Sequence, residues 1–162
     1  MSWFEDSSQL VSCSSDKSVK IWNVESGECA HELQVADTPQ LEDMQLAVEK
    51  IPGYIVSISL SGAMNFWDVK SVQSGELKPQ EVYRNHRKPI IGWGANQQGQ
   101  LVTLDKEGLI ITHNFNSEKL GSDFFALDKR LIKGVVITSK DLILASFASK
   151  IFQISLTEKK IQ

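Results

Sequence analysis

The sequence predicts an all-β chain of repeated four-stranded antiparallel blades, which together form an arc of about 3.5 to 4 blades of a β-propeller. The first observation is a period: short apolar runs recur in steps of 45, 46 and 42 residues, beginning at Leu10, Ile55, Leu101 and Ile143. Repeats of propeller blades are typically about 40–45 residues long. The second observation is a turn position six residues after each beginning, occupied in order by Asp16, Ser61, Glu107 and Ser149.

The apolar runs are the second strands of the predicted blades, over 10–14, 55–59, 101–105 and 143–147. Each turn leads to a third strand that is rich in β-branched and aromatic residues and carries no proline, as paired strands require. These third strands are 19–24, 63–69, 109–115 and 151–156. We expect first strands at 1–4, 44–48, 90–94 and 133–138, and outer strands at 29–35, 81–84 and 123–127, with the chain ending before a fourth outer strand. No helix is predicted, and the blades span approximately 1–35, 41–86, 89–128 and 130–157.

Composition and charge exclude several classes of partner. The chain has 162 residues, of which 41% are hydrophobic, and 17 Lys and Arg against 20 Asp and Glu give a net charge of −3. Such a mixed balance produces no broad field that would attract nucleic acid or anionic lipid. The start of the chain lacks the basic and apolar regions of a secretory signal, and no window approaches 18 continuous apolar residues. We therefore expect a soluble cytoplasmic protein, in which Cys13 and Cys29 are reduced thiols.

Residue patterns that carry chemistry are sparse. The three histidines fall in three different predicted blades, at positions 31, 86 and 113, and form no pair at metal-ligand spacing. No GxSxG nucleophile motif occurs. We expect neither an enzyme nor a bound cofactor or metal. Trp22 and Trp67 could be ligand-stacking platforms, but their strand positions favour core packing, and truncating Trp22 to alanine is expected to cost about 3–5 kcal/mol.

The segment from Leu10 to Asn23, which ends in Trp22-Asn23, resembles a WD-repeat, and the Trp-Asp pair recurs intact at Trp67-Asp68. In such repeats a turn Asp, a strand Ser or Thr, the Trp and a His before the first strand form a buried hydrogen-bonded tetrad. The resemblance implies a structural tetrad with members at Asp16, at Ser12 or Ser14, and at Trp22, with Trp67 in the next blade. The three later blades depart from the pattern, since Ser61 and Glu107 replace the turn Asp, and His113 and Ser155 stand where Trp is expected.

Within the WD-repeats, the chain resembles the actin-interacting protein 1 family. The similarity rests on the run Ile55 to Gly62, on the preceding Gln40 to Leu46, and on the run Asn85 to Ile90, which enters the third blade. It implies a protein-interaction module that binds actin filaments and cofilin, promotes filament disassembly, and is located in the cytoplasm and cytoskeleton. The alternative is a WD-repeat scaffold that assembles a multiprotein complex unrelated to actin.

The densest basic run, Arg84 to Lys88, falls on the connection between two predicted blades. It can be an ordinary solvated loop, or a patch for an acidic protein surface, and His86 can also be a remnant of the tetrad. The candidate partner-binding residues are Lys17, Arg84, His86, Arg87, Lys88 and Lys106.

The repeat count predicts an incomplete ring. Propellers usually close with roughly four to eight blades, so an arc exposes the flanks of its first and last blades. Apolar residues would then face water or a neighbour, among them Trp3, Phe4, Ile132, Phe147 and Phe152. We expect the chain to self-associate through these open blade edges.

Overall fold

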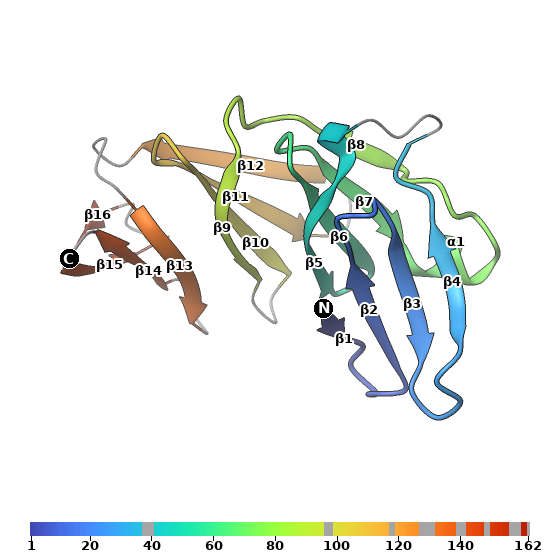
Figure 1. Cartoon of the computed structure of the whole chain (residues 1–162). Helices are drawn as coiled ribbons and strands as arrows, with labels where there is room; N and C mark the ends of the chain where they lie inside the picture. The colour runs from blue at the N-terminus through green and yellow to red at the C-terminus, as the bar shows by residue number, and fades with distance from the viewer. Residues whose placement is uncertain are drawn as a thin grey trace. The chain divides into compact units, whose positions relative to one another are not determined.

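Four antiparallel sheets of four strands each make up the described part of the chain (Figure 1). The structure is a computed structural model. It describes the backbone of residues 1–36, 41–95, 99–116, 119–126, 132–138, 142–147, 150–155 and 160–161, and the side chains of residues 1–36, 41–95 and 99–113. The chain divides into two compact units, Met1–Arg87 and Lys88–Gln162, with two sheets in each.

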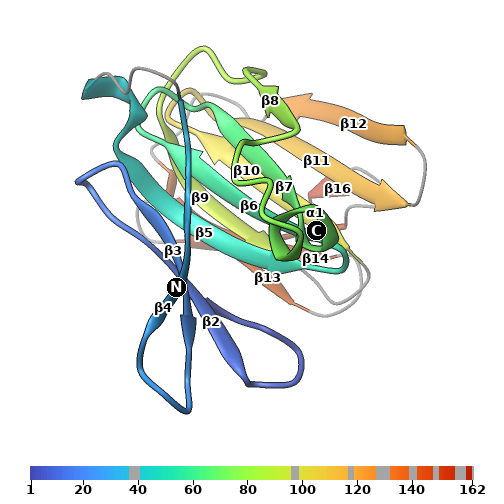
Figure 2. The same ribbon diagram turned by 90° about the vertical axis from the view of Figure 1, so that its right-hand side faces the viewer.

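The first unit holds two meandering sheets in which each strand pairs with the next. The first sheet is formed by β1 (Ser2–Trp3), β2 (Gln9–Cys13), β3 (Val19–Asn23) and β4 (Cys29–Leu33). The second is formed by β5 (Gln45–Ile51), β6 (Tyr54–Ser59), β7 (Met64–Asp68) and β8 (Glu81–Tyr83), and Figure 2 shows β5, β6 and β7 side by side. The 3-10 helix η1 (Leu41–Asp43) precedes β5, and the helix α1 (Val69–Gln73) follows β7.

The second unit repeats this plan. Its first sheet is formed by β9 (Ile90–Ala95), β10 (Gln100–Asp105), β11 (Leu109–Asn116) and β12 (Lys119–Ala126). Its second is formed by β13 (Ile132–Thr138), β14 (Leu142–Phe147), β15 (Lys150–Ser155) and β16 (Lys160–Ile161). Figure 1 shows these strands in yellow to red.

The predicted four-stranded antiparallel blades are confirmed, and three details of the prediction are wrong. A helix does occur: Asp68 caps α1 by accepting a hydrogen bond from the Ser71 amide at 2.8 Å, so the residue that ends the Trp-Asp motif also begins a helix. The strand β16 supplies the fourth outer strand that the sequence was expected to lack. The strand β12 begins at Lys119 rather than at residue 123. The predicted turn residue Ser149 and the end of the outer strand at residue 127 lie outside the described residues.

The core of the first unit lies between its two sheets. Strand alternation directs Val11 of β2, Ile21 of β3 and Ile55 of β6 into one cluster with Trp67, and all four are at most 2% exposed. Phe4 packs against this cluster, whereas Trp3 is 53% exposed. The side chains at 132, 147 and 152 lie outside the described set, and self-association stays a prediction.

Within the described part of the chain, no helix is long and apolar enough to cross a membrane.

Candidate functional site

Three turns share one geometry, the turns Ser14–Ser18 (β2 to β3), Ser59–Ala63 (β6 to β7) and Asp105–Leu109 (β10 to β11). In each turn the fourth residue has a positive φ: 76° at Lys17, 82° at Gly62 and 89° at Gly108. The amide of that fourth residue donates to the carbonyl of the first at 3.0–3.1 Å. The three blades therefore share the same turn backbone, although the sequences of the turns differ.

The amide of the fifth turn residue also has a side-chain acceptor in each case, but the acceptor changes position. Asp16 Oδ1 accepts from the Ser18 amide at 2.9 Å, as the third residue of its turn. In the next blade the Ala63 amide donates to Ser59 Oγ, from the first turn residue, at 3.2 Å and to Ser61 Oγ, from the third, at 3.4 Å. In the third blade Asp105 accepts from the amides of Leu109 at 3.0 Å and Glu107 at 2.9 Å, again from the first position.

The predicted turn residue of the third blade, Glu107, is therefore not the acceptor of its turn. Glu107 is exposed and pairs with Lys88 at 3.4 Å, whereas Asp105 is only 2% exposed. A glutamate carries one more methylene than an aspartate, and the short Asp side chain is the one that reaches nearby backbone amides in turns. The sequence did contain a signal for this acceptor, because Asp105 ends the apolar run 101–105, two residues before the turn position of Glu107.

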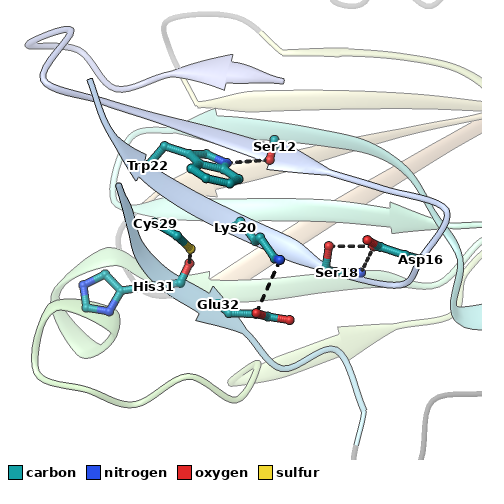
Figure 3. Close-up of polar contacts among 8 residues, drawn as sticks. All are labelled: Ser12, Asp16, Ser18, Lys20, Trp22, Cys29, His31 and Glu32. Atoms are coloured by element: carbon teal, nitrogen blue, oxygen red, sulfur yellow. Dashed lines mark hydrogen bonds and ion pairs between the residues drawn. The ribbon is translucent and has the colours of Figure 1, made fainter. Parts of the chain in front are cut away.

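The predicted tetrad is only partly present in the first blade. The Trp22 indole Nε1–H donates to Ser12 Oγ at 2.8 Å, which selects Ser12 over Ser14 as the strand acceptor. Asp16 is exposed and bonds to the hydroxyl and amide of Ser18 at 2.6 and 2.9 Å, apart from the Ser12–Trp22 pair (Figure 3). These hydrogen bonds from Ser18 hold the pKa of Asp16 below its usual value. Asp16 stabilises its own turn, as an Asx turn does, and does not extend a buried network.

Trp67 uses a different partner. Its side chain is fully buried, and its indole Nε1–H donates to the Leu77 carbonyl at 3.0 Å rather than to Ser57, the serine that matches Ser12. Ser57 instead donates to Gln45 Oε1 at 2.6 Å and accepts from Asn65 Nδ2 at 3.2 Å. The Leu77 carbonyl also accepts the Gln34 amide at 2.8 Å, so one acceptor joins the two sheets of the first unit.

The third blade carries a buried polar pair at the position where His113 stands in place of the expected Trp. Thr103 and His113, both fully buried, approach to 3.3 Å between Oγ1 and Nε2. They occupy the strand positions of Ser12 and Trp22, ten residues apart in both blades. The histidine thus replaces the tryptophan without loss of a polar contact on this face of the sheet.

The predicted partner-binding residues divide between the two units. In the first unit, Arg84 and Arg87 are exposed, Lys17 is half-buried and His86 is only 4% exposed. The side chain of His86 is therefore not available to a partner. In the second unit Lys88 and Lys106 are exposed, and Lys88 forms the surface ion pair with Glu107.

The strand ends of the first unit gather into one surface, which we call the turn face: the Ser14–Ser18 turn, η1, the Ser59–Ala63 turn and Arg84. Backbone bonds hold the parts together, from Ser61 N to Glu42 O at 3.1 Å and from Gln45 N to Ser14 O at 3.2 Å. Arg84 Nη1 donates to Ser61 Oγ at 3.5 Å. Two exposed apolar side chains, Leu41 at 68% and Leu60 at 37%, lie on the same segments. Arginine among exposed apolar groups is a composition that protein contacts favour.

Lys17 is strained in its turn, because a left-handed conformation costs an L-residue with a Cβ roughly 1–2 kcal/mol. The other two turns place glycine at this position. We expect Lys17→Gly to raise the free energy of unfolding by about 0.5–1 kcal/mol, the relief of strain less the added entropy of an unfolded glycine. Urea denaturation followed by circular dichroism measures the change. Gly62→Ala is the converse variant and should destabilise; a Lys17→Gly midpoint at or below the wild-type value would contradict this reading of the turn.

In the described side chains, no group of three or more His, Cys, Asp or Glu residues could hold a metal ion. The two cysteines are free thiols, and burial raises the pKa of Cys13. Cys29 is exposed, and its thiol contacts the His31 carbonyl (Figure 3).

The chain is similar to known proteins in sequence and in fold. It is 30% identical over 118 residues to actin-interacting protein 1 of Drosophila melanogaster, which covers 72% of this chain and 18% of that protein. It is 33% identical over 90 residues to WD repeat-containing protein 1 of Xenopus tropicalis, which covers 56% of this chain and 14% of that protein. The chain thus spans less than a fifth of the length of these relatives. No family model matches it.

Among solved structures, the crystal structure of the RRP9 WD40 repeats matches 97% of this chain and 47% of its own, with a TM-score of 0.78 and 17% identity. This likeness shows the fold, and the sequence similarity shows the family. The chain belongs to the WD-repeat β-propellers, and among them it resembles actin-interacting protein 1.

Proposed function

We propose that the chain is a protein-interaction module of an actin-interacting protein 1-like factor, which binds actin filaments and cofilin and promotes filament disassembly in the cytoplasm. The observation that carries this proposal is the 30% identity to actin-interacting protein 1 over 118 residues. The turn face supports a binding role, because it combines Arg84 and Lys17 with the exposed Leu41 and Leu60 on a backbone that hydrogen bonds hold in place.

The mechanism follows from rigidity. Sheets of paired strands fix the loops at their ends, so a partner that contacts the turn face meets side chains that need little ordering on binding. The cations would direct the approach of an acidic surface and make association salt-sensitive. The apolar side chains would then be buried in the contact. Catalysis has no part in this proposal.

The test is co-sedimentation of the 162-residue chain with actin filaments, bare or decorated with cofilin. We expect enrichment in the pellet on decorated filaments over bare ones. The double variant Lys17→Glu/Arg84→Glu should lower the pelleted fraction at least about fivefold, since reversal of an arginine in a protein contact is among the largest single effects at interfaces. Lys70→Glu is the matched control, because Lys70 is an exposed cation on α1, at the opposite end of β7 from the turn face.

Equal amounts of chain with decorated and bare filaments would remove cofilin from the proposal, and no sedimentation with either would remove actin. The second outcome would favour the alternative, a WD-repeat scaffold for a complex unrelated to actin. An unchanged pellet for the double variant would instead move the contact away from the turn face.

A further inference from the structure

A groove runs along the outer edges of the two sheets of the first unit, separate from the Ser14–Ser18 turn and η1. It has a volume of about 370 Å³ and is lined by Gln34, Val35, Ala36, Lys78, Pro79, Val82 and Arg84. One wall is the segment that follows β4, and the other is β8 with the residues around it. Both β4 and β8 are the last strands of their sheets, so their outer edges pair with no described strand.

Strand alternation in β8 sorts the side chains by charge. Val82 and Arg84 line the groove together, two residues apart, while Glu81 and Tyr83 lie on the opposite face. The Tyr83 hydroxyl donates to Glu81 and the Tyr83 ring packs edge-on against Phe66 at 5.1 Å, which holds this acid away from the groove. Burial and the bond to Glu81 raise the pKa of Tyr83 to about 12.

The groove lining therefore combines cations with apolar side chains. Its seven lining residues include two cations, Lys78 and Arg84, and no acid, in a chain whose net charge is −3. The neighbouring hollow of about 490 Å³ differs, because Asp16 and Glu32 line it beside Lys17. Val82 lines the groove and is 45% exposed although it is a strand residue.

The position of the groove indicates what could occupy it. The Gln34 amide donates to the Leu77 carbonyl at 2.8 Å, so a backbone hydrogen bond joins the two walls of the groove. Its volume is at the low end of the roughly 300–1,000 Å³ of ligand sites. That is enough for a few side chains of an extended segment, and too small for a folded domain. Strand edges beside shallow apolar pockets are a recurrent mode of peptide recognition.

We propose that this groove binds an extended acidic peptide segment of a protein partner, with its carboxylates beside Lys78 and Arg84 and an apolar side chain on Val82. The inference does not depend on actin or cofilin as partners. It adds a second contact surface to the chain, on the outer strands, which shares only Arg84 with the turn face.

The test uses three fluorescein-labelled octapeptides, in which valine alternates with glutamate, glutamine or lysine. Fluorescence anisotropy with the full chain should show saturable binding of the glutamate peptide, at least about tenfold tighter than the glutamine peptide, with no binding of the lysine peptide. The affinity should fall as salt rises, since exposed charges are screened. Equal affinities for the glutamate and glutamine peptides, or no binding of either, would overturn the proposal.

Val82→Glu places a carboxylate in the groove lining and should weaken binding of the glutamate peptide at least about tenfold. Val24→Glu is the matched control, because Val24 is 42% exposed and does not line the groove. Unchanged binding by Val82→Glu, or equal losses in the two variants, would overturn the location. Phosphatidylserine vesicles that bind the chain while the glutamate peptide does not would assign the cations to a membrane surface instead. Lys17→Glu changes the turn face but not the groove lining, so it should leave binding of the glutamate peptide unchanged, which separates this test from that of the turn face.

Discussion

Replacing Trp67 with alanine should lower the free energy of unfolding of the first unit by about 3–5 kcal/mol, the usual loss for a large aromatic side chain removed from a core. Trp67 is 0% exposed, lies in the cluster between the two sheets and donates its indole N–H to Leu77. Domains are typically stable by only about 5–15 kcal/mol, so this change removes a large part of the total. Urea denaturation followed by far-UV circular dichroism gives the measurement.

Two further variants separate the contributions of packing and hydrogen bonding. Trp67→Phe keeps an aromatic ring but removes the donor, and should cost less than Trp67→Ala. Trp3→Ala is the surface control, because Trp3 is 53% exposed, and its effect should stay within about 0.5 kcal/mol. Equal effects of Trp67→Ala and Trp3→Ala would show that the tryptophan does not support the core. Trp22 is only half-buried, so its truncation should cost less than truncation of Trp67 and less than the about 3–5 kcal/mol expected from the sequence.

Asp105→Ala should destabilise the second unit by about 2–4 kcal/mol. Its carboxylate accepts from two backbone amides, of Glu107 and Leu109, and the side chain is only 2% exposed. Both amides are only part-buried, so each should lie at the lower end of the about 1–3 kcal/mol that a buried donor costs when it loses its acceptor, and here two donors lose theirs. Thermal and urea denaturation of the full chain would measure the loss.

Glu107→Gln is the matched control, and it tests the sequence alignment directly. Glu107 occupies the column of Asp16, but it is exposed, and its ion pair with Lys88 lies at the surface, where such pairs contribute little. We expect a change of less than about 0.5 kcal/mol. A larger loss of unfolding free energy in Glu107→Gln than in Asp105→Ala would show that the turn position shared with Asp16, and not Asp105, stabilises this turn.

The contrast between these two residues shows what the sequence could predict. The period and the strand runs gave the four-stranded sheets because alternation and strand propensity act locally, within the residues being read. The acceptor of the third turn could not be placed in the same way. A backbone amide N–H can donate to any side-chain oxygen within reach. The acceptor can therefore lie on the third turn residue or on the first while the backbone conformation stays the same.

The candidate site was predictable to a similar extent. Charge and loop position were enough to single out Arg84 and Lys17, both of which the structure places on the turn face. They were not enough to show that His86 is buried, because burial depends on what packs against a residue from elsewhere in the chain. The groove was not predicted, since Val35 and Val82 are 47 residues apart in the sequence and only the arrangement of the outer strands brings them to one surface.

The carbonyl of Leu77 has a consequence for how the connection between α1 and β8 can change. It receives one N–H from Trp67 and one from Gln34, so its position is specified from two sheets at once. Surface loops usually tolerate insertions and deletions. Here, adding or removing a single residue between Gly75 and Leu77 would move the Leu77 carbonyl away from its two donors. Both the Trp67 indole N–H and the Gln34 amide would then lose their acceptor. The length of this segment is therefore constrained even though most of its side chains face the solvent.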